Sequence, residues 1–253
     1  KVLNFVDVFG KEYTVKINSK VKKNPYIKEG FCHRGDMISY IGDTRYTSRI
    51  GIDVSHHQSD INWEKVKEQG IEFAFLRIGY RGYGKLGKIC KDKEFEANIK
   101  NAQKQGIDVG VYFFSQAVNE REAQEEADFV IKNLENKQLQ LPVVFDPENI
   151  LDDDARTDNV SGEQFTRNTI SFCKRIEAAG YTPVIYSNML WEAYQLDLEK
   201  LKNYSIWYAD YETEPQTPYY FEYWQYTNQA NIEGIPGKVD MDIQLIPINN
   251  EKK

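Results

Sequence analysis

Cysteine is scarce in this chain of 253 residues, and the three that occur, Cys32, Cys90 and Cys173, are far apart. An odd and widely spaced set suits neither a zinc site nor a disulfide scaffold. Hydrophobic residues make up 41% of the chain, which is enough to build a sizeable core instead. We expect Cys90 and Cys173 to be small buried residues on helices.

Long apolar runs and clusters of basic residues are also missing. The longest apolar runs have the length of a strand, far below the ~18 residues that a membrane-spanning helix needs, so we expect no membrane span. The net charge is −7 and no basic cluster occurs, which argues against nucleic acid as a partner. The chain starts at Lys1 with neither methionine nor signal peptide, and we expect that a signal peptide has been removed.

Helices and strands alternate along most of the chain. Three segments share one pattern, the end of a helix, a glycine suited to its C-terminus, and an apolar run of strand length. These segments are 66–80, 102–116 and 176–190, with Gly70, Gly106 and Gly180. Capping pairs start two helices. The pairs are Asn119 with Glu122, for a helix near 120–135, and Ser161 with Gln164, for a helix near 162–178.

Further strand candidates bring the total to about eight. They are residues 49–54, 142–147, 205–210, 221–227 and 241–246. Alternation of this kind favours a parallel sheet, and the count favours a closed barrel. Long helices are missing from 205–246, so we expect an α/β fold, an irregular TIM-like β/α barrel, over residues 49–248.

The first 48 residues have a different pattern. Apolar and polar residues alternate around Gly10, which predicts a β-hairpin, and turn signals follow. We interpret residues 1–48 as a small β-rich extension packed on the barrel, which contributes stability or substrate reach and no chemistry. Residues 249–253 form a polar tail.

An apolar strand ends on two carboxylates in "VVFDPENI", residues 143–150. Side chains at i and i+2 share one face of a strand, so Val144, Asp146 and Glu148 point the same way. If Val144 faces the barrel interior, both acids rise into the mouth, where β/α barrels build their sites. Two close carboxylates repel, which raises the pKa of one and supplies the acid–anion pair that glycoside cleavage uses. An exposed Asp-Pro turn explains the same residues equally well.

Other predicted strand ends add acids and aromatic rings to the same mouth. Asp53 ends the first core strand, and Asp240 stands at the entrance to the last one. Strand ends also contribute Tyr112, Tyr186 and Trp207, which are suited to stacking on a sugar or bonding to it. Four carboxylates and several aromatic rings around one mouth form a glycosidase-like set.

Six motifs occur in the order and approximate spacing of one enzyme family. They are GIDVSHHQ, the carboxylate pair in PVVFDPE, PVIYSN, IWYADY, YWQYT and GKVDMD. Over roughly residues 49–248 the chain resembles the glycoside hydrolase family 25 lysozymes, which are N-acetylmuramidases. Two positions depart from the family pattern, Pro147 between the paired acids and Asp242 where asparagine is common.

The resemblance implies cleavage of the β-1,4 bond from N-acetylmuramic acid to N-acetylglucosamine in bacterial peptidoglycan. It implies that Glu148 is the general acid, that Asp146, Asp53 and Asp240 line the same site, and that Gln225 binds substrate. Because Asp146 is only two residues from the acid, we expect it to orient the substrate's 2-acetamido group. We expect a monomeric, secreted or cell-wall-associated enzyme without cofactor or metal.

Two alternative functions fit the same sequence. One is a glycan-binding barrel without activity, although all four acids are kept. The other is a glycosidase of chitin-like N-acetylhexosamine polymers. Three further signals have simple interpretations. On an extended segment His56 and His57 point to opposite sides, so they are a poor metal pair. Residues 151–158 are interpreted as a solvated acidic loop, and residues 119–129 as the solvated face of an amphipathic helix.

Overall fold

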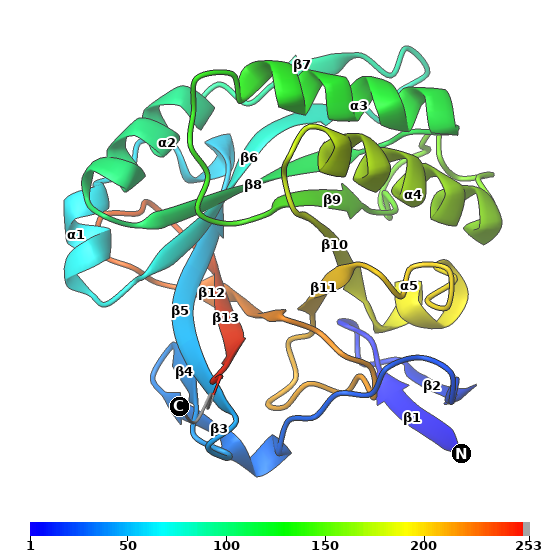
Figure 1. The fold of residues 1–253 in the computed structure, drawn as a ribbon, viewed down its shortest axis with the longest axis horizontal. Coiled ribbons are helices and arrows are strands. Elements are labelled where there is room, and N and C mark those ends of the chain that lie inside the picture. The colour runs from blue at the N-terminus through cyan, green and yellow to red at the C-terminus, as the bar shows by residue number, and fades with distance from the viewer. Residues whose placement is uncertain (250–253) are drawn as a thin grey trace.

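The computed structural model describes residues 1–249, and eight of their strands form a closed barrel (Figure 1). The barrel order is β5, β6, β8, β9, β10, β11, β12 and β13, and the pairing of β5 with β6 closes the ring. Their bounds are Tyr46–Val54, Phe73–Arg81, Asp108–Ser115, Val143–Pro147, Pro183–Asn188, Ser205–Ala209, Tyr223–Ala230 and Val239–Pro247. The predicted barrel is therefore confirmed, and its first strand begins three residues earlier than we expected.

Strand β13 is the irregular member of the barrel. It is antiparallel to both of its neighbours, β12 and β5, whereas every other neighbouring pair in the ring is parallel. A parallel return needs a crossover of a dozen or more residues, and only 231–238 separate β12 from β13. The short connection therefore forces the last strand to run backwards, so that it starts at the barrel mouth.

The helices cover the outside of the parallel strands (Figure 1). They are α1 (Trp63–Glu68), α2 (Phe95–Lys104), α3 (Glu120–Asn133), α4 (Gly162–Ala178) and α5 (Met189–Tyr194). Both predicted caps form, because Asn119 accepts a bond from the Glu122 N–H and Ser161 accepts one from the Gln164 N–H. A left-handed glycine follows three of the helices, with φ of +93° at Gly70, +73° at Gly106 and +90° at Gly180.

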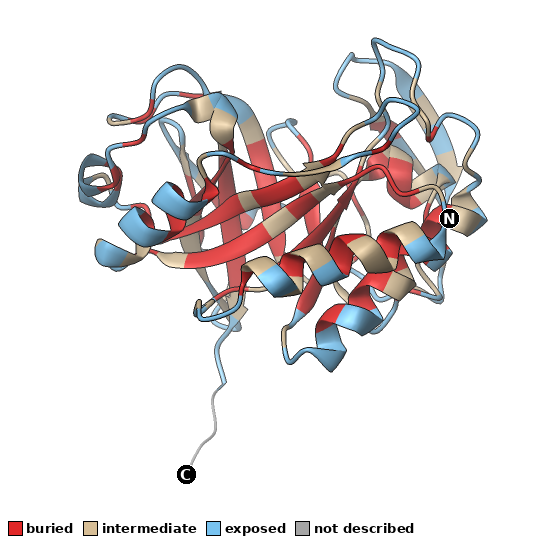
Figure 2. Cartoon of the chain, turned by 90° about the horizontal axis from the view of Figure 1, so that it is seen from above, coloured by how far each residue is buried: buried red, intermediate tan, exposed pale blue. Residues whose placement is uncertain are grey.

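The interior of the barrel is filled with rings and aliphatic side chains. Its members are Phe73, Phe75, Leu141, Val144, Val184, Trp207 and Tyr223. Val144 faces this interior, as the interpretation of the "VVFDPENI" segment requires. The strands are buried along most of their length, whereas the helices alternate buried and exposed residues (Figure 2). This pattern places the helices' apolar faces against the barrel.

The N-terminal region contains two hairpins outside the barrel. Strands β1 (Val2–Val6) and β2 (Glu12–Lys16) form one, and β3 (Phe31–Arg34) and β4 (Met37–Tyr40) form the other, with the 3-10 turn Lys28–Gly30 before it. The region is β-rich, as predicted. An aromatic contact holds it to the barrel, because Phe31 packs edge-on against Trp224 of β12 with 5.1 Å between ring centroids. The Tyr26 hydroxyl also donates to the Phe221 carbonyl, just before β12. Treating residues 1–48 as a separate unit remains a proposal.

The position of Cys90 differs from our expectation, and most of the predicted polar tail lies outside the described residues. Cys90 is a half-buried residue of the short strand β7 (Ile89–Lys91), which pairs with β6, and not a helical residue, while Cys173 is buried in α4 as expected. Of the predicted polar tail, residues 250–253 lie outside the described residues. Among residues 1–249, no helix has the length and hydropathy of a membrane span.

Candidate active site

A cavity of about 250 Å³ opens at the barrel mouth. All eight side chains predicted for the site line it: Asp53, Tyr112, Asp146, Glu148, Tyr186, Trp207, Gln225 and Asp240. These residues come from seven strands, with Glu148 directly after one of them, and they span most of the chain, so only the closed barrel brings them together. The lining also includes residues that we did not predict, among them Arg77, His57 and Tyr211.

Asp53 and Asp240 lie opposite each other in neighbouring strands. Asp53 is near the C-terminal end of β5, and Asp240 is near the N-terminal end of β13, where the register pairs them directly. They meet at the mouth because β13 runs antiparallel to β5. Burial is the main cause of a raised pKa at both carboxyls, and the neighbouring carboxylates add to it.

Gln225, on β12, connects this acid pair to the aromatic wall. Its side-chain amide donates to Asp53 at 2.8 Å and to Asp240 at 3.3 Å. Its carbonyl oxygen accepts from the hydroxyls of Tyr186 at 2.8 Å and Tyr211 at 2.7 Å. One buried amide therefore fixes the positions of two acids and two phenols around the cavity.

Asp146 and Glu148 form the second acid pair. Asp146 is only 4% exposed, and its Oδ1 has no hydrogen-bond partner among the described residues. Burial, followed by the charge of Glu148, raises the pKa of Asp146 well above its ordinary value. Burial also raises the pKa of Glu148, while its interaction with Asp146 lowers it. We predicted a raised pKa from repulsion alone, but desolvation is the larger cause at both groups.

Trp207 is the floor of the cavity. It is 1% exposed and stacks on Phe75 with 4.6 Å between ring centroids. Tyr112 and Tyr186 form T-shaped contacts with it. Its indole N–H donates to Asp242 at 2.7 Å, so it is not free to bond to a ligand. Of the aromatic residues predicted to bind substrate, Tyr112 and Tyr186 are the more accessible ones.

Arg77 introduces a positive charge that the sequence analysis missed. It lies in β6, and its guanidinium donates to Asp92 at 2.9 Å and contacts the His56 ring. An arginine inside the apolar run FAFLRIGY was a usable signal, because an unpaired charge in a buried strand is costly. Its field lowers the pKa of Asp146, against the larger effect of burial.

The histidines and the acidic helix also differ from their simple interpretations. His56 and His57 lie in the 3-10 turn His56–Gln58, so their rings lie next to each other, tilted by 35° with 4.2 Å between centroids, and do not point apart. Within α3, Glu126 is fully buried and accepts bonds from Ser115 at 2.7 Å and Arg81 at 3.2 Å. The segment 119–129 is therefore not only a solvated face.

Gln116 is another residue that we did not predict. It follows β8, is 1% exposed, and donates its side-chain N–H to the backbone carbonyl of Glu148 at 2.7 Å. Its side-chain oxygen accepts from Thr157 at 3.0 Å, in the loop after β9. These bonds fix the backbone that carries Glu148. Among residues 1–249, no three His, Cys, Asp or Glu side chains are grouped to hold a metal ion.

Comparison with protein families identifies the fold's relatives. The model of the glycosyl hydrolases family 25 matches residues 52–235, which is most of the barrel and includes Asp53, Asp146 and Glu148. The chain belongs to glycosyl hydrolase family 25. It is therefore a glycoside hydrolase, as its motifs indicated.

Individual relatives are distant. The Escherichia coli K12 protein YegX is 27% identical over 203 residues, which cover 76% of this chain and 68% of YegX. A lysozyme from Streptomyces coelicolor has a TM-score of 0.61 and 27% identity, over 77% of this chain and 90% of that structure.

The modular autolysin LytC from Streptococcus pneumoniae has a TM-score of 0.69 and 24% identity. The alignment covers 96% of this chain and 56% of that structure, so this glycoside hydrolase spans little more than half of LytC. LytC has also been solved in complex with a synthetic peptidoglycan ligand. The coverage of 96% extends the likeness in fold into the N-terminal region.

Proposed function

We propose that this glycoside hydrolase cleaves the β-1,4 bond between N-acetylmuramic acid and N-acetylglucosamine in bacterial peptidoglycan. Family membership and the peptidoglycan-bound form of the relative LytC support the substrate class. The observation that carries the proposal is the acid pair Asp146 and Glu148 in the lining of the cavity at the mouth, where Oδ1 of Asp146 is buried without a hydrogen-bond partner among the described residues. The proposed enzyme acts outside the cell or at the wall, as a monomer.

Glu148 is the general acid in this proposal. Bond cleavage requires a proton on the leaving sugar oxygen, and a carboxyl with a raised pKa can hold that proton near neutral pH. In the free enzyme the more deeply buried Asp146 competes for the proton that the pair shares. A bound acetamido N–H that donates to Asp146 favours its ionised form, which transfers the shared proton to Glu148.

Asp146 then polarises the acetamido group. Its buried Oδ1 lacks a donor, and leaving a buried acceptor unpaired costs about 1–3 kcal/mol, which a substrate N–H recovers. The acetamido oxygen can stabilise the developing oxocarbenium charge, so no protein nucleophile is needed. Asp53 and Asp240, held by Gln225, bind the sugar whose ring carries that charge.

Analysis of the new reducing ends tests the proposal. Purified cell walls would be digested, the products reduced with borohydride, and the reduced sugar identified by mass spectrometry. N-acetylmuramitol is the expected product. Reduced N-acetylglucosamine from cell walls, or new reducing ends from chitin alone, would contradict the proposal. Tight glycan binding without any new reducing ends would indicate a glycan-binding barrel without activity.

A further inference from the structure

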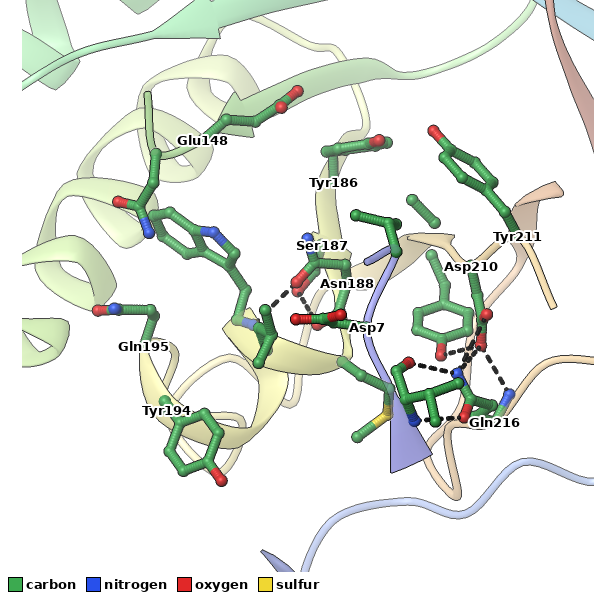
Figure 3. A pocket seen from close by; sticks show the side chains of 18 of the residues that line it. Asp7, Glu148, Tyr186, Ser187, Asn188, Tyr194, Gln195, Asp210, Tyr211 and Gln216 are labelled. Carbon is green, nitrogen blue, oxygen red and sulfur yellow. Dashed lines mark hydrogen bonds between the residues drawn. The ribbon is translucent and has the colours of Figure 1, made fainter. Parts of the chain in front are cut away.

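A second cavity, of about 390 Å³, lies beside the catalytic one (Figure 3). The two cavities share Glu148, Tyr186 and Tyr211 in their linings. The second cavity does not touch Asp53, Asp240 or Gln225 among the described residues, so it extends away from the sugar-binding acids and past the general acid. Its volume is within the range of small-molecule sites.

The N-terminal hairpin forms one wall of this groove. Residues 6–9, at the end of β1 and in the turn, line it together with α5 and the ends of β10 and β11. The tip is apolar but exposed, with Val8 63% and Phe9 77% accessible. Eleven large hydrophobic residues are exposed in the described chain, and five of them line this groove: Val8, Phe9, Leu151, Tyr194 and Tyr211. Such a concentration of exposed apolar surface marks a binding site.

The hairpin is held rigidly in this position. Gln216 donates to the Val6 carbonyl at 2.9 Å and accepts from the Val6 N–H at 2.8 Å, as a neighbouring strand would. The Gln216 N–H in turn donates to Asp210, directly after β11. Asp7 stabilises the turn, because it accepts from the N–H groups of Phe9 and Lys11. The groove wall is therefore organised before any ligand binds.

The position of the general acid decides which part of a substrate the groove can hold. Glu148 must approach the oxygen of the leaving sugar, so the leaving half of the strand lies on the outer side of this residue. The groove begins at this side. No Lys, Arg or His occurs in its described lining, whereas Asp7 and Glu212 do, so next to the scissile bond it suits the uncharged N-acetylglucosamine better than an anionic group.

We propose that the groove binds the sugars on the leaving-group side of the scissile bond, with Phe9 at the hairpin tip as a stacking surface. This inference rests on the proposed function. Of the two contributions that we expected from residues 1–48, stability or substrate reach, it favours substrate reach. Aromatic rings serve this purpose well, since a sugar ring covers their apolar face while its hydroxyls remain solvated.

Strands of defined length test the groove. The full chain would be assayed with tetrasaccharides and octasaccharides of alternating N-acetylglucosamine and N-acetylmuramic acid, as wild type, Phe9→Ala and Ile41→Ala. Ile41 is 73% exposed and lies outside the groove lining, so it is the matched control. Phe9→Ala should raise KM for the octasaccharide about fivefold, the size expected for partial burial of one ring, and raise it less for the tetrasaccharide. Ile41→Ala should match wild type.

A binding measurement separates this inference from the proposed function. Calorimetric titration of the octasaccharide into Glu148→Gln protein, with and without Phe9→Ala, should show about fivefold weaker binding when Phe9 is absent. If wild type cleaves no glycan, the proposed function fails, and this titration still decides whether the groove binds. Equal dissociation constants, or an equal loss in Ile41→Ala, would overturn the inference.

Discussion

Asp242 provides a test of how burial controls the acids beneath the site. It is 0% exposed on β13, accepts one bond from the Trp207 N–H, and has no partner for Oδ2 among the described residues. Burial is the main cause that raises its pKa from 3.8 to about 7. This rise corresponds to roughly 4 kcal/mol in favour of the neutral form.

The sign of the pH dependence follows from the direction of the shift. The pKa of Asp242 is higher in the folded chain than in the unfolded chain. The contribution of its neutral carboxyl to folding stability is therefore complete below about pH 4 and is lost as the pH rises towards 7. Asparagine cannot ionise and can still accept the Trp207 bond. The Asp242→Asn protein should therefore gain stability relative to wild type between pH 4 and pH 8, by up to roughly 4 kcal/mol.

Urea unfolding at pH 4 and pH 8 measures this gain as the difference in free energy of unfolding between Asp242→Asn and wild type. The pH-dependent contributions of the carboxyls that both proteins retain cancel in this difference. The exposed Asp60 offers a matched control, because Asp60→Asn should change stability by less than about 0.5 kcal/mol at either pH. If Asp242→Asn destabilises the protein at pH 8, or by the same amount at both pH values, the reasoning about Asp242 is wrong.

Three further predictions concern the scaffold and the chemistry. Gln116→Leu removes the donor to the Glu148 carbonyl. It should lower kcat about tenfold, measured by glycan cleavage kinetics, and reduce the free energy of unfolding by about 1–3 kcal/mol, measured by urea unfolding. Gly180→Ala places a side chain at φ +90°, and should cost about 1 kcal/mol or more in thermal unfolding without loss of activity. Activity should survive EDTA, since the chain's own carboxyls supply the acid and the anion; loss on chelation that added metal restores would point to another reaction.

Local signals predicted the framework of the fold well. The caps at Asn119 and Ser161 and the glycines after three helices act within a few residues, so they are readable from the sequence. The strand ends were predicted from local sequence for the same reason, and they placed Asp53 and Asp240 at the barrel mouth. The direction of β13 was not predicted, although its short connection to β12 excludes a parallel return.

Long-range pairing accounts for what the sequence could not show. Glu126 looked like one of several solvated acids on α3, because its partner Arg81 lies 45 residues away. Gln116 bonds to Glu148 across 32 residues, and nothing local marks it. The hairpin tip is the clearest case, since the contacts that hold Phe9 at the groove include the bonds of Gln216 to Val6, 210 residues away.

The most direct test of the central claim is the rate of peptidoglycan cleavage by Glu148→Gln protein. The substitution preserves the shape of the side chain but removes the proton donor, so the rate should fall by about 10²–10⁴-fold while glycan binding persists. Glu163→Gln is the matched control, because Glu163 is exposed in the first turn of α4 and pairs with Arg167. Folded Glu148→Gln protein that cleaves cell walls at close to the wild-type rate would contradict the assignment of Glu148 as the acid.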